Sequence, residues 1–457
     1  MIKENENFIV ECDENVDYID DLVSTLEKEM QRILSFFEIP NLKEKKTIKI
    51  WNSREKYQAY LEQYVAKYYD WMIADTYDGH INMLSVDECR KTKSHEDITM
   101  SSFLQNIIHE FVHSCQQEIN SNATNVEWFW EALATNLGNP FDHVTSIQYS
   151  KEELMYQFAS LPYSYNTAYT IGKYMLEKIS HNQILEYVKN PQKLIDDTDN
   201  IIANAKKWFN ERYLMLPTIP KAENESFVIY ASDSLSQLAH DTLSELSANK
   251  QRILNFFGLT NYRKVEVNLY DNQDDFIGFL KNIRSPEWPV PDYCQGTFDD
   301  YMINHSIDLK TLNDRYSKYL KSTLHEFIHI IYNDAVAKER VIWLDEGLAI
   351  NLSGDYSVYD DDEKFRTFFQ TSILSIENLP SINELAHGKE FVNEDYNGYD
   401  LSYLAVRYML ETMPHDDILS TIKESEAARL LGQNVLDDAI QYYSNKLEIV
   451  PIGKHSL

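Results

Sequence analysis

The sequence predicts an α+β protein of two tandem domains, residues 1–220 and 221–457, each with a small mixed sheet followed by a mainly helical part. Three observations predict this class. The chain has 457 residues, about three times the usual single-domain length. Its second half repeats blocks of the first half in the same order. Within each copy, strand-like alternation comes first and helical periodicity follows.

The repeated blocks lie at an offset of about 220 residues. The clearest pair is QRILSFF at 31–37 and QRILNFF at 251–257. The other pairs are FIVEC near Phe8 with FVIYA near Phe227, TYDGHIN near Thr76 with TFDDYMIN near Thr297, HEFVH at His109 with HEFIH at His325, and WFWEALATNLG at Trp128 with WLDEGLAINLSG at Trp343. Five pairs in one order indicate a duplication. Two prolines and a polar run at 216–226 predict the boundary near residue 220.

Each half begins with a short strand, followed by an amphipathic helix through the QRIL block. A second strand follows, KTIKIW in the first half and KVEVNLY in the second. Ser53 is a good N-cap and predicts that another helix begins after it. A third strand passes through HINML and YMINHSI, and the remainder of each half is expected to be helical.

Composition limits the classes of partner. Apolar residues make up 43% of the chain, which is enough to build globular cores. The net charge of −31, without a Lys/Arg cluster, argues against nucleic acid and against anionic membranes as partners. The four cysteines are scattered and lack CxxC spacing, and there is no leader or membrane-spanning run, so we expect a cytoplasmic protein. No motif identifies a partner protein.

The HEFVH and HEFIH blocks carry the chemistry. Residues four apart on a helix share a face, so His109 and His113 can bind one ion, and His325 and His329 can bind another. The apolar spacing around both blocks predicts that they are helical. One such motif is modest evidence, but both pairs have persisted while the surrounding residues diverged.

Catalytic zinc needs a third protein ligand and an open position. Glu131 and Glu346, 18 and 17 residues after the second histidine of each pair, are the candidates. Each lies in a W-x-x-E-[A/G]-L-A-x-N-L block that is expected to form a short second helix. We therefore expect one Zn²⁺ in each domain.

WLDEGLAINLSG closely resembles the WLxEGLA segment of MA-clan peptidases, the gluzincins related to thermolysin and the M1 aminopeptidases. The resemblance covers roughly residues 76–180 and 297–412. It implies a zinc-dependent metallopeptidase in which Glu110 and Glu326 act as general bases on a metal-activated water. In M1-like enzymes a tyrosine on a later helix stabilises the oxyanion, and position by position this points to Tyr165 and Tyr399.

The same resemblance implies that the strand before each motif, at 79–84 and 301–306, is an edge strand that pairs with an extended peptide substrate. The chain also departs from the family. Where thermolysin-like enzymes have an Asp four residues after the Glu ligand, this chain has Thr135 and Ile350, so support for the histidines must come from elsewhere. There is no GxMEN-type segment, which disfavours an aminopeptidase.

The second half matches the family more closely. It has Gly347 after the ligand where the first half has Ala132, and Asp345 before it where the first half has Trp130. If only one site works, we expect it to be the second. Two alternatives stay open: a catalytically silent protein that binds metal and peptide, or one active domain with a degenerate docking copy. The substrate is expected to be a peptide or protein.

Other residues receive a structural interpretation. His80 and His305 are expected to be solvated strand histidines. Cys115 lies about 200° around the helix from the ligand face and is expected to be a buried thiol. The acidic run from Asp355 to Glu363 lacks the spacing of an EF-hand and is interpreted as a solvated loop.

Overall fold

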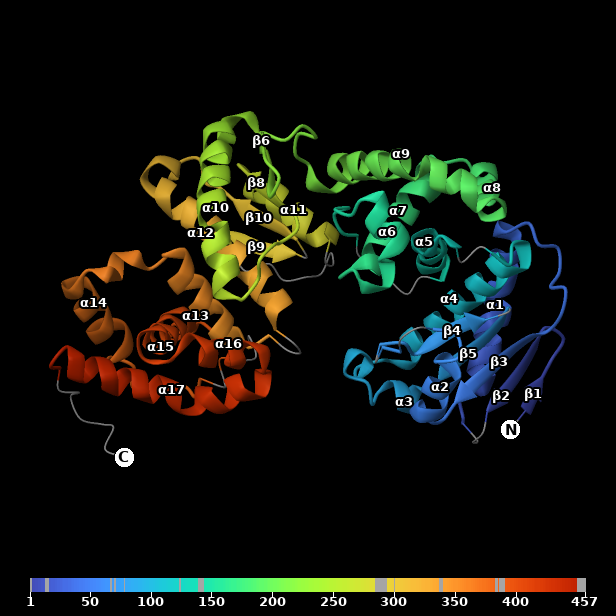
Figure 1. Ribbon diagram of the computed structural model, residues 1–457, viewed down its shortest axis with the longest axis horizontal. Coiled ribbons are helices and arrows are strands. Elements are labelled where there is room, and N and C mark those ends of the chain that lie inside the picture. The colour runs from blue at the N-terminus through green and yellow to red at the C-terminus, as the bar shows by residue number, and fades with distance from the viewer. Residues whose placement is uncertain are drawn as a thin grey trace. The chain divides into compact units, whose positions relative to one another are not determined.

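The computed structural model describes most of the chain. The described residues are 2–12, 16–65, 68–69, 71–77, 79–122, 125–138, 144–283, 294–299, 301–336, 340–382, 385 and 391–449. They form two compact units (Figure 1). The first comprises residues up to 213, and the second comprises residues from 214 onward, except that 281–283 group with the first.

The first unit contains a five-stranded mixed sheet in the order β1-β2-β3-β5-β4. Its central strands β2, β3 and β5 are parallel, and β1 and β4 are added antiparallel at the two edges. The strands are β1 (Ile2–Glu4), β2 (Phe8–Cys12), β3 (Lys46–Trp51), β4 (Ala74–Tyr77) and β5 (His80–Leu84).

Helices make up most of the remainder of this unit. They are α1 (Ile19–Phe36), α2 (Arg54–Leu61), α3 (Val86–Cys89), α4 (Met100–Ile119), α5 (Glu127–Gly138), α6 (Lys151–Tyr156), α7 (Ser164–Lys178), α8 (His181–Lys189) and α9 (Pro191–Phe209), with short turns η1 (Lys93–His95), η3 (Phe158–Ser160) and η4 (Asn210–Leu214). The Ser53 side chain accepts a hydrogen bond from the backbone N–H of Lys56, so the expected N-cap of α2 is confirmed.

The second unit repeats this architecture. Its sheet has the order β6-β7-β8-β10-β9, with the same pattern of strand directions. The strands are β6 (Ala222–Glu223), β7 (Phe227–Ala231), β8 (Val265–Tyr270), β9 (Gly296–Asp299) and β10 (Met302–Ser306). The helices are α10 (Ser236–Phe256), α11 (Gln273–Ile283), α12 (Leu312–Ala335), α13 (Ile342–Ser353), α14 (Asp362–Phe368), α15 (Gly398–Thr412), α16 (His415–Lys423) and α17 (Ser425–Lys446), with turns η5 (Asp233–Leu235), η6 (Ser357–Asp360) and η7 (Phe369–Ile373).

The expected combination of α and β structure, with a small mixed sheet in each half, is confirmed. One expectation about the sheets is wrong: β5 and β10 are not edge strands. Each lies between a parallel neighbour and a short antiparallel strand, β4 or β9, which forms the edge. The edge strands were missed because they are only four residues long and partly exposed, and they lack clear hydrophobic alternation.

The core of each unit lies between the sheet and its helices. On the sheet of the first unit, Val10, Ile48 and Ile81 are fully buried. On α1, Leu22 and Leu26 are buried one turn apart, which gives the amphipathic pattern its physical basis. Among the described residues, no helix combines the length and hydropathy that a membrane span requires.

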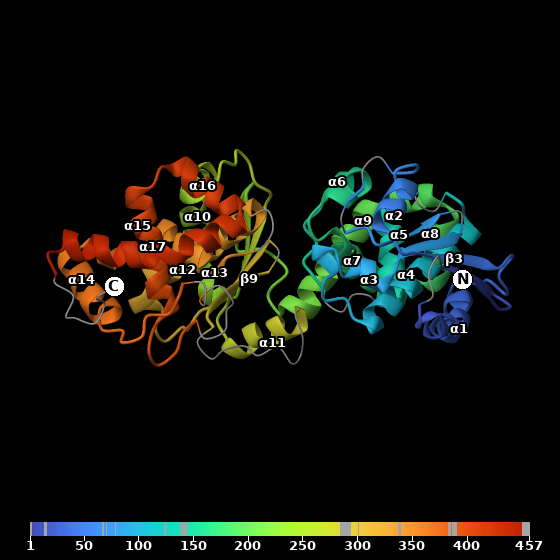
Figure 2. The same ribbon diagram turned by 90° about the horizontal axis from the view of Figure 1, so that it is seen from below.

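Two helix pairs, α5 with α7 and α13 with α15, place the site residues (Figures 1 and 2). In addition, α5 packs on α4, and α13 packs on α12. An asparagine at the same position of each block links its pair: Asn136 Nδ2 donates to the backbone oxygens of Ala132 and Tyr169, and Asn351 Nδ2 donates to those of Gly347 and Tyr403.

In each unit, the close approach of the two helices of the pair depends on one glycine. This glycine lies on α7 in the first unit and on α13 in the second. A Cβ added at Gly172 on α7 would lie 2.4 Å from the Ala132 oxygen. A Cβ added at Gly347 on α13 would lie 2.4 Å from Cγ2 of Val406, which is the α15 residue equivalent to Gly172. The difference between Ala132 and Gly347 therefore has a packing reason.

Candidate metal centres

The first cluster combines two residues of α4 with one of α5. The Nε2 atoms of His109 and His113 are 3.1 Å apart. Oε2 of Glu131 lies 3.1 Å from Nε2 of His109 and 3.5 Å from Nε2 of His113. The three sequence-predicted ligands of the first half therefore converge on one point, and all three are buried.

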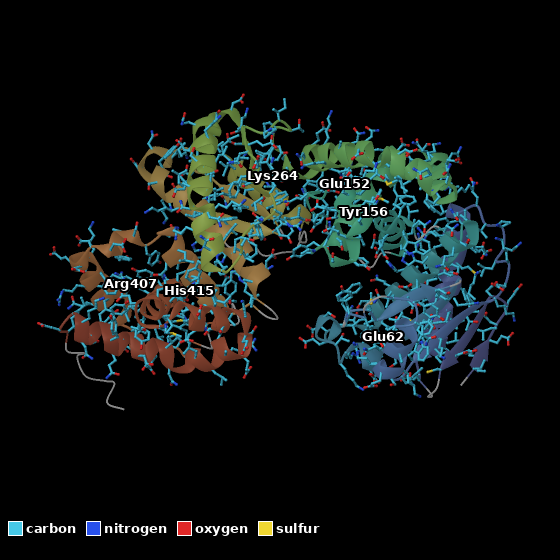
Figure 3. All side chains as sticks on the ribbon, in the orientation of Figure 1. Glu62, Glu152, Tyr156, Lys264, Arg407 and His415 are labelled. Atoms are coloured by element: carbon cyan, nitrogen blue, oxygen red, sulfur yellow. The ribbon has the colours of Figure 1, made fainter. Side chains whose placement is uncertain are left out.

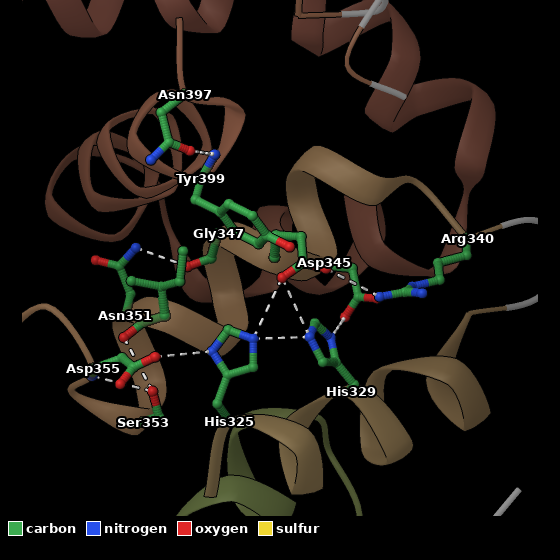
Figure 4. A network of polar contacts seen from close by, with 12 residues as sticks. His325, His329, Arg340, Asp345, Gly347, Asn351, Ser353, Asp355, Asn397 and Tyr399 are labelled. Atoms are coloured by element: carbon green, nitrogen blue, oxygen red, sulfur yellow. Dashed lines mark hydrogen bonds and ion pairs between the residues drawn. The ribbon is translucent and has the colours of Figure 1, made fainter. Parts of the chain in front are cut away.

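The second cluster has the same construction on α12 and α13. The Nε2 atoms of His325 and His329 are 2.9 Å apart, and Oε2 of Glu346 lies 3.3 Å from each of them. Figure 4 shows the two imidazoles on adjacent turns, facing each other across this point.

The donor atoms of each cluster suit a cation. Gln116 Nε2 donates to the Trp130 backbone, so its Oε1 faces Nδ1 of His113 at 2.9 Å. Because that oxygen can only accept, Nδ1 carries the proton and Nε2 presents its lone pair to the cluster. Among the described residues, Oε2 of Glu131 is buried with no hydrogen-bond donor other than the two imidazoles. Lone pairs that converge in this way repel one another unless a positive charge lies between them.

The spacing is compatible with zinc. Tetrahedral nitrogen and oxygen ligands at about 2.0–2.1 Å from zinc are separated by roughly 3.3 Å. The observed separations run from 3.1 to 3.5 Å in the first cluster and from 2.9 to 3.3 Å in the second. Two neutral imidazoles and one carboxylate also match a zinc donor set that leaves one position open.

The surroundings of the ligands differ between the units. In the first unit, His113 has the neutral amide of Gln116 at Nδ1, and the Trp130 ring stacks on its imidazole at 4.4 Å between centroids, almost parallel. Nδ1 of His109 is buried and has no hydrogen-bond partner among the described residues. Burial would raise the pKa of Glu131, yet the His113 and His109 imidazoles lower it to about 2.

In the second unit, carboxylates lie beside Nδ1 of both histidines. Asp345 Oδ1 lies 2.6 Å from Nδ1 of His329, and Asp355 Oδ2 lies 3.6 Å from Nδ1 of His325. The second oxygen of Asp345 accepts a hydrogen bond from Arg340, whose Nη2 is also 3.4 Å from Oε1 of Glu346. Burial disfavours a charged His329, but Asp345 and Glu346 outweigh it and raise its pKa to about 10.

Hydrogen-bond contacts to Nδ1 therefore come from Gln116 for His113 and from Asp345 for His329, whereas Asp355 lies near His325 but beyond hydrogen-bond distance. Asp355 begins the acidic run that the sequence suggested was a solvated loop. The far end of the run, 360–363, is exposed as expected, but the interpretation is wrong for Asp355. The run continues into η6 and α14, and the Asp355 side chain is only 16% exposed. Asp355 follows Glu346 by nine residues, and no general spacing rule marks such a position.

The two expected bases lie beside the clusters. Oε2 of Glu110 lies 2.7 Å from Oγ1 of Thr76 on the edge strand β4, and that hydroxyl also lies 2.9 Å from the Glu110 backbone oxygen. Glu326 approaches the other edge strand, since a Cβ added at Gly296 would lie 2.8 Å from its Oε1. Burial, as the largest influence, raises the pKa of Glu326. A raised pKa suits a group that must accept a proton.

Tyr165 and Tyr399 are the second residues of α7 and α15. Tyr165 lines a cavity that contains the first cluster, with its ring 5.8 Å from that of Trp71. In Figure 4, Tyr399 extends from the start of α15 towards the side of the cluster where Asp345 and Gly347 lie. Both tyrosines therefore lie on the helix that packs against the Glu ligand.

The cavity of the first unit has a volume of about 700 Å³. His109, Glu110, His113 and Glu131 all line it. The sides of the cavity are formed by the end of α2, by β4 with the segment before it, and by the start of α7. The lining residues from these elements include Leu61, Met72, Ile73, Asp75, Thr76 and Tyr165. The cavity is large enough for several residues of a peptide.

Three residues, His305, His80 and Cys115, were expected to have structural rather than functional roles. His305 is buried rather than solvated as expected, and its Nδ1 contacts Thr323 Oγ1. Burial lowers its pKa to about 3. His80 is partly exposed and accepts a hydrogen bond from the backbone of Thr47. Cys115 is fully buried as expected, and burial raises the pKa of its thiol.

No model of a known protein family and no curated protein sequence matches this chain.

Proposed function

We propose that the chain is a zinc-dependent peptidase, with one Zn²⁺ in each unit and a peptide or protein as substrate. The observation that carries this proposal is the convergence, in each unit, of two imidazole Nε2 atoms and one carboxylate oxygen at zinc-like spacing beside a further glutamate. The cytoplasmic location expected from the sequence stays a prediction.

Bound zinc would supply a Lewis acid that polarises the substrate carbonyl and lowers the pKa of a bound water. His109, His113 and Glu131 would hold it in the first unit, and His325, His329 and Glu346 in the second. Glu110 and Glu326 would accept the water proton and deliver it to the leaving amine. The Thr76 hydroxyl contacts Oε2 of Glu110 and so helps to orient this carboxylate.

Tyr165 and Tyr399 would donate a hydrogen bond to the oxyanion that develops on the substrate carbonyl. Such a donor must remain protonated, and burial raises the pKa of Tyr165. The peptide would extend along the outer side of β4 or β9, because an edge strand can pair with an extended chain through backbone hydrogen bonds. Thr76 links β4 to the base, so the strand that would align the peptide also positions Glu110.

Two measurements test the proposal. Elemental analysis should find about two zinc ions in the wild type and about one in each of His109→Ala and His325→Ala. Hydrolysis of unfolded protein should be lost in the double variant Glu110→Gln/Glu326→Gln, whose metal ligands are intact. Undiminished hydrolysis in that variant would falsify the proposed mechanism.

The single variants decide between the remaining alternatives. If both units work, Glu110→Gln and Glu326→Gln each remove part of the activity. If one unit only docks substrate, one variant removes all turnover and the other removes none. Zinc content without hydrolysis of any substrate, together with a melting temperature that falls on chelation, would identify a catalytically silent metal-binding protein.

A further inference from the structure

We propose that the first unit selects substrates that carry a cationic nitrogen near the cleaved bond, that Glu127 recognises this nitrogen, and that the second unit lacks this selectivity. This inference rests on the proposed function of the first cluster and names the chemistry of its substrate.

Glu127 lies in the right place for this role. It is the first residue of α5, one helical turn before Glu131, so the two side chains share a face of the helix. Both line the cavity that contains the cluster. Glu127 is half-buried, and none of the described residues forms a hydrogen bond or ion pair with its carboxylate. A carboxylate in a cavity without a partner is available to a ligand.

The charge of the cavity supports the same conclusion. Among the described lining residues, four are carboxylates, Asp75, Glu110, Glu127 and Glu131, and none is Lys or Arg. A divalent ion would offset two of these charges, those of Glu131 and Glu110. The cavity would still be negative around Glu127.

The shape of the cavity suits a cation at the end of an apolar stem. Leu61, Val65, Met72 and Ile73 contribute an apolar wall, and Trp71 adds an aromatic surface. A lysine or arginine side chain could place its methylene groups against such a wall while its nitrogen reaches a carboxylate. A peptide N-terminus offers the same ammonium chemistry without the stem.

The second unit serves as an internal comparison. Its residue at the Glu127 position is Ile342, the first residue of α13, four before Glu346. Asp75 lies opposite Asn82 in the β-ladder, and the residue opposite the equivalent Asn304 is Thr297. The second unit thus keeps the metal ligands and the base but has neither of these two carboxylates.

Selectivity is tested with the second unit silenced by Glu326→Gln. A peptide library carries either lysine or norleucine at one position at a time, with a free or an acetylated N-terminus. The first unit is expected to favour lysine or the free N-terminus by roughly tenfold to a hundredfold in kcat/KM, the range for a charged hydrogen bond. Glu127→Gln should bring this ratio close to one, mainly through KM, with zinc content unchanged.

The matched control is Glu152→Gln, the same change on the exposed Glu152 of α6 in the same unit (Figure 3). It should keep the wild-type ratio. The acetylated and free peptides separate the two sources of the nitrogen: a preference abolished by acetylation identifies the N-terminus, and one retained identifies the side chain. In the complementary experiment, Ile342→Glu in a Glu110→Gln background should give the second unit a preference for lysine.

Binding separates this inference from the proposed function. In zinc-loaded Glu110→Gln/Glu326→Gln protein, calorimetry should show tighter binding of the preferred cationic peptide than of its norleucine or acetylated counterpart, and Glu127→Gln should remove the difference. If this holds but the wild type hydrolyses nothing, the peptidase proposal fails while the cation site stands. If the wild type hydrolyses peptides yet Glu127→Gln leaves both ratios unchanged, the cation site is overturned.

Discussion

Asp345 Oδ1 lies 2.6 Å from Nδ1 of His329, at the position where the first unit instead stacks Trp130 on His113. At the same position of the duplicated block, the two units therefore support the candidate ligand histidine in different ways. A carboxylate makes the imidazole a stronger donor, whereas an indole ring only holds its orientation. The two clusters share their ligands but should differ in metal affinity.

Asp345→Asn should weaken zinc binding in the second unit by about 10- to 100-fold, the usual effect of losing a carboxylate behind a ligand histidine. The measurement is chelator competition in a His109→Ala background, so that only the second unit binds metal. Asp437→Asn, the same change on an exposed position of α17, should have no effect. Equal affinities in these two variants would contradict the role of Asp345.

Gly296→Ala should impair the second unit without unfolding it. The added Cβ would lie 2.8 Å from Oε1 of Glu326, the free end of a flexible side chain that can move away. Displacement of the base should lower kcat at least tenfold while the melting temperature and zinc content stay near wild type. The assay uses a Glu110→Gln background, and wild-type kcat in the variant would show that this contact does not position Glu326.

Gly347→Ala should destabilise the second unit by about 1–3 kcal/mol, because a Cβ there would meet Cγ2 of Val406 at 2.4 Å and the backbone oxygen of Ser402 at 2.5 Å. Val406→Ala should recover part of this loss, since it removes the clash with Cγ2 but leaves those with the Ser402 oxygen and with Cβ of residue 406, at 2.9 Å. Denaturant unfolding of the wild type, both single variants and the double variant gives the coupling. Additive effects would show that the two helices do not share this contact.

The stability of the metal-free first unit should fall as pH rises from about 4 to about 7. Burial, and then repulsion by Glu110, raise the pKa of Asp75 to about 7 from an ordinary value of 3.8. Over this window the unfolded chain loses the proton first, so deprotonation favours unfolding. The loss amounts to at most about 4 kcal/mol and is complete above pH 7.

Asp75→Asn cannot titrate and should remove the share of this pH dependence that comes from Asp75. Urea unfolding with chelator at pH 5 and pH 8 gives the comparison. The stability of the variant relative to wild type should be more favourable at pH 8 than at pH 5. The opposite sign would mean that a positive group faces Asp75 in the folded protein.

Much of the fold follows from local patterns. The central strands β2, β3 and β5 and their counterparts were predicted because each buries alternate or successive apolar residues. The edge strands β4 and β9 were not predicted, since half-exposed four-residue segments have no distinctive composition. This omission matters for the site, because Thr76 on β4 contacts Glu110, the proposed base.

The sequence by itself determined the duplication and the candidates for metal ligands and bases, because these depend on spacing within a helix and on blocks that recur. Only the tertiary structure decided what surrounds them. Asp355 faces His325, Asp345 faces His329, and Glu127 lines a cavity, through packing between elements that no local pattern specifies. Spacing along a helix is set by covalent geometry, whereas contacts between helices depend on which faces are buried together.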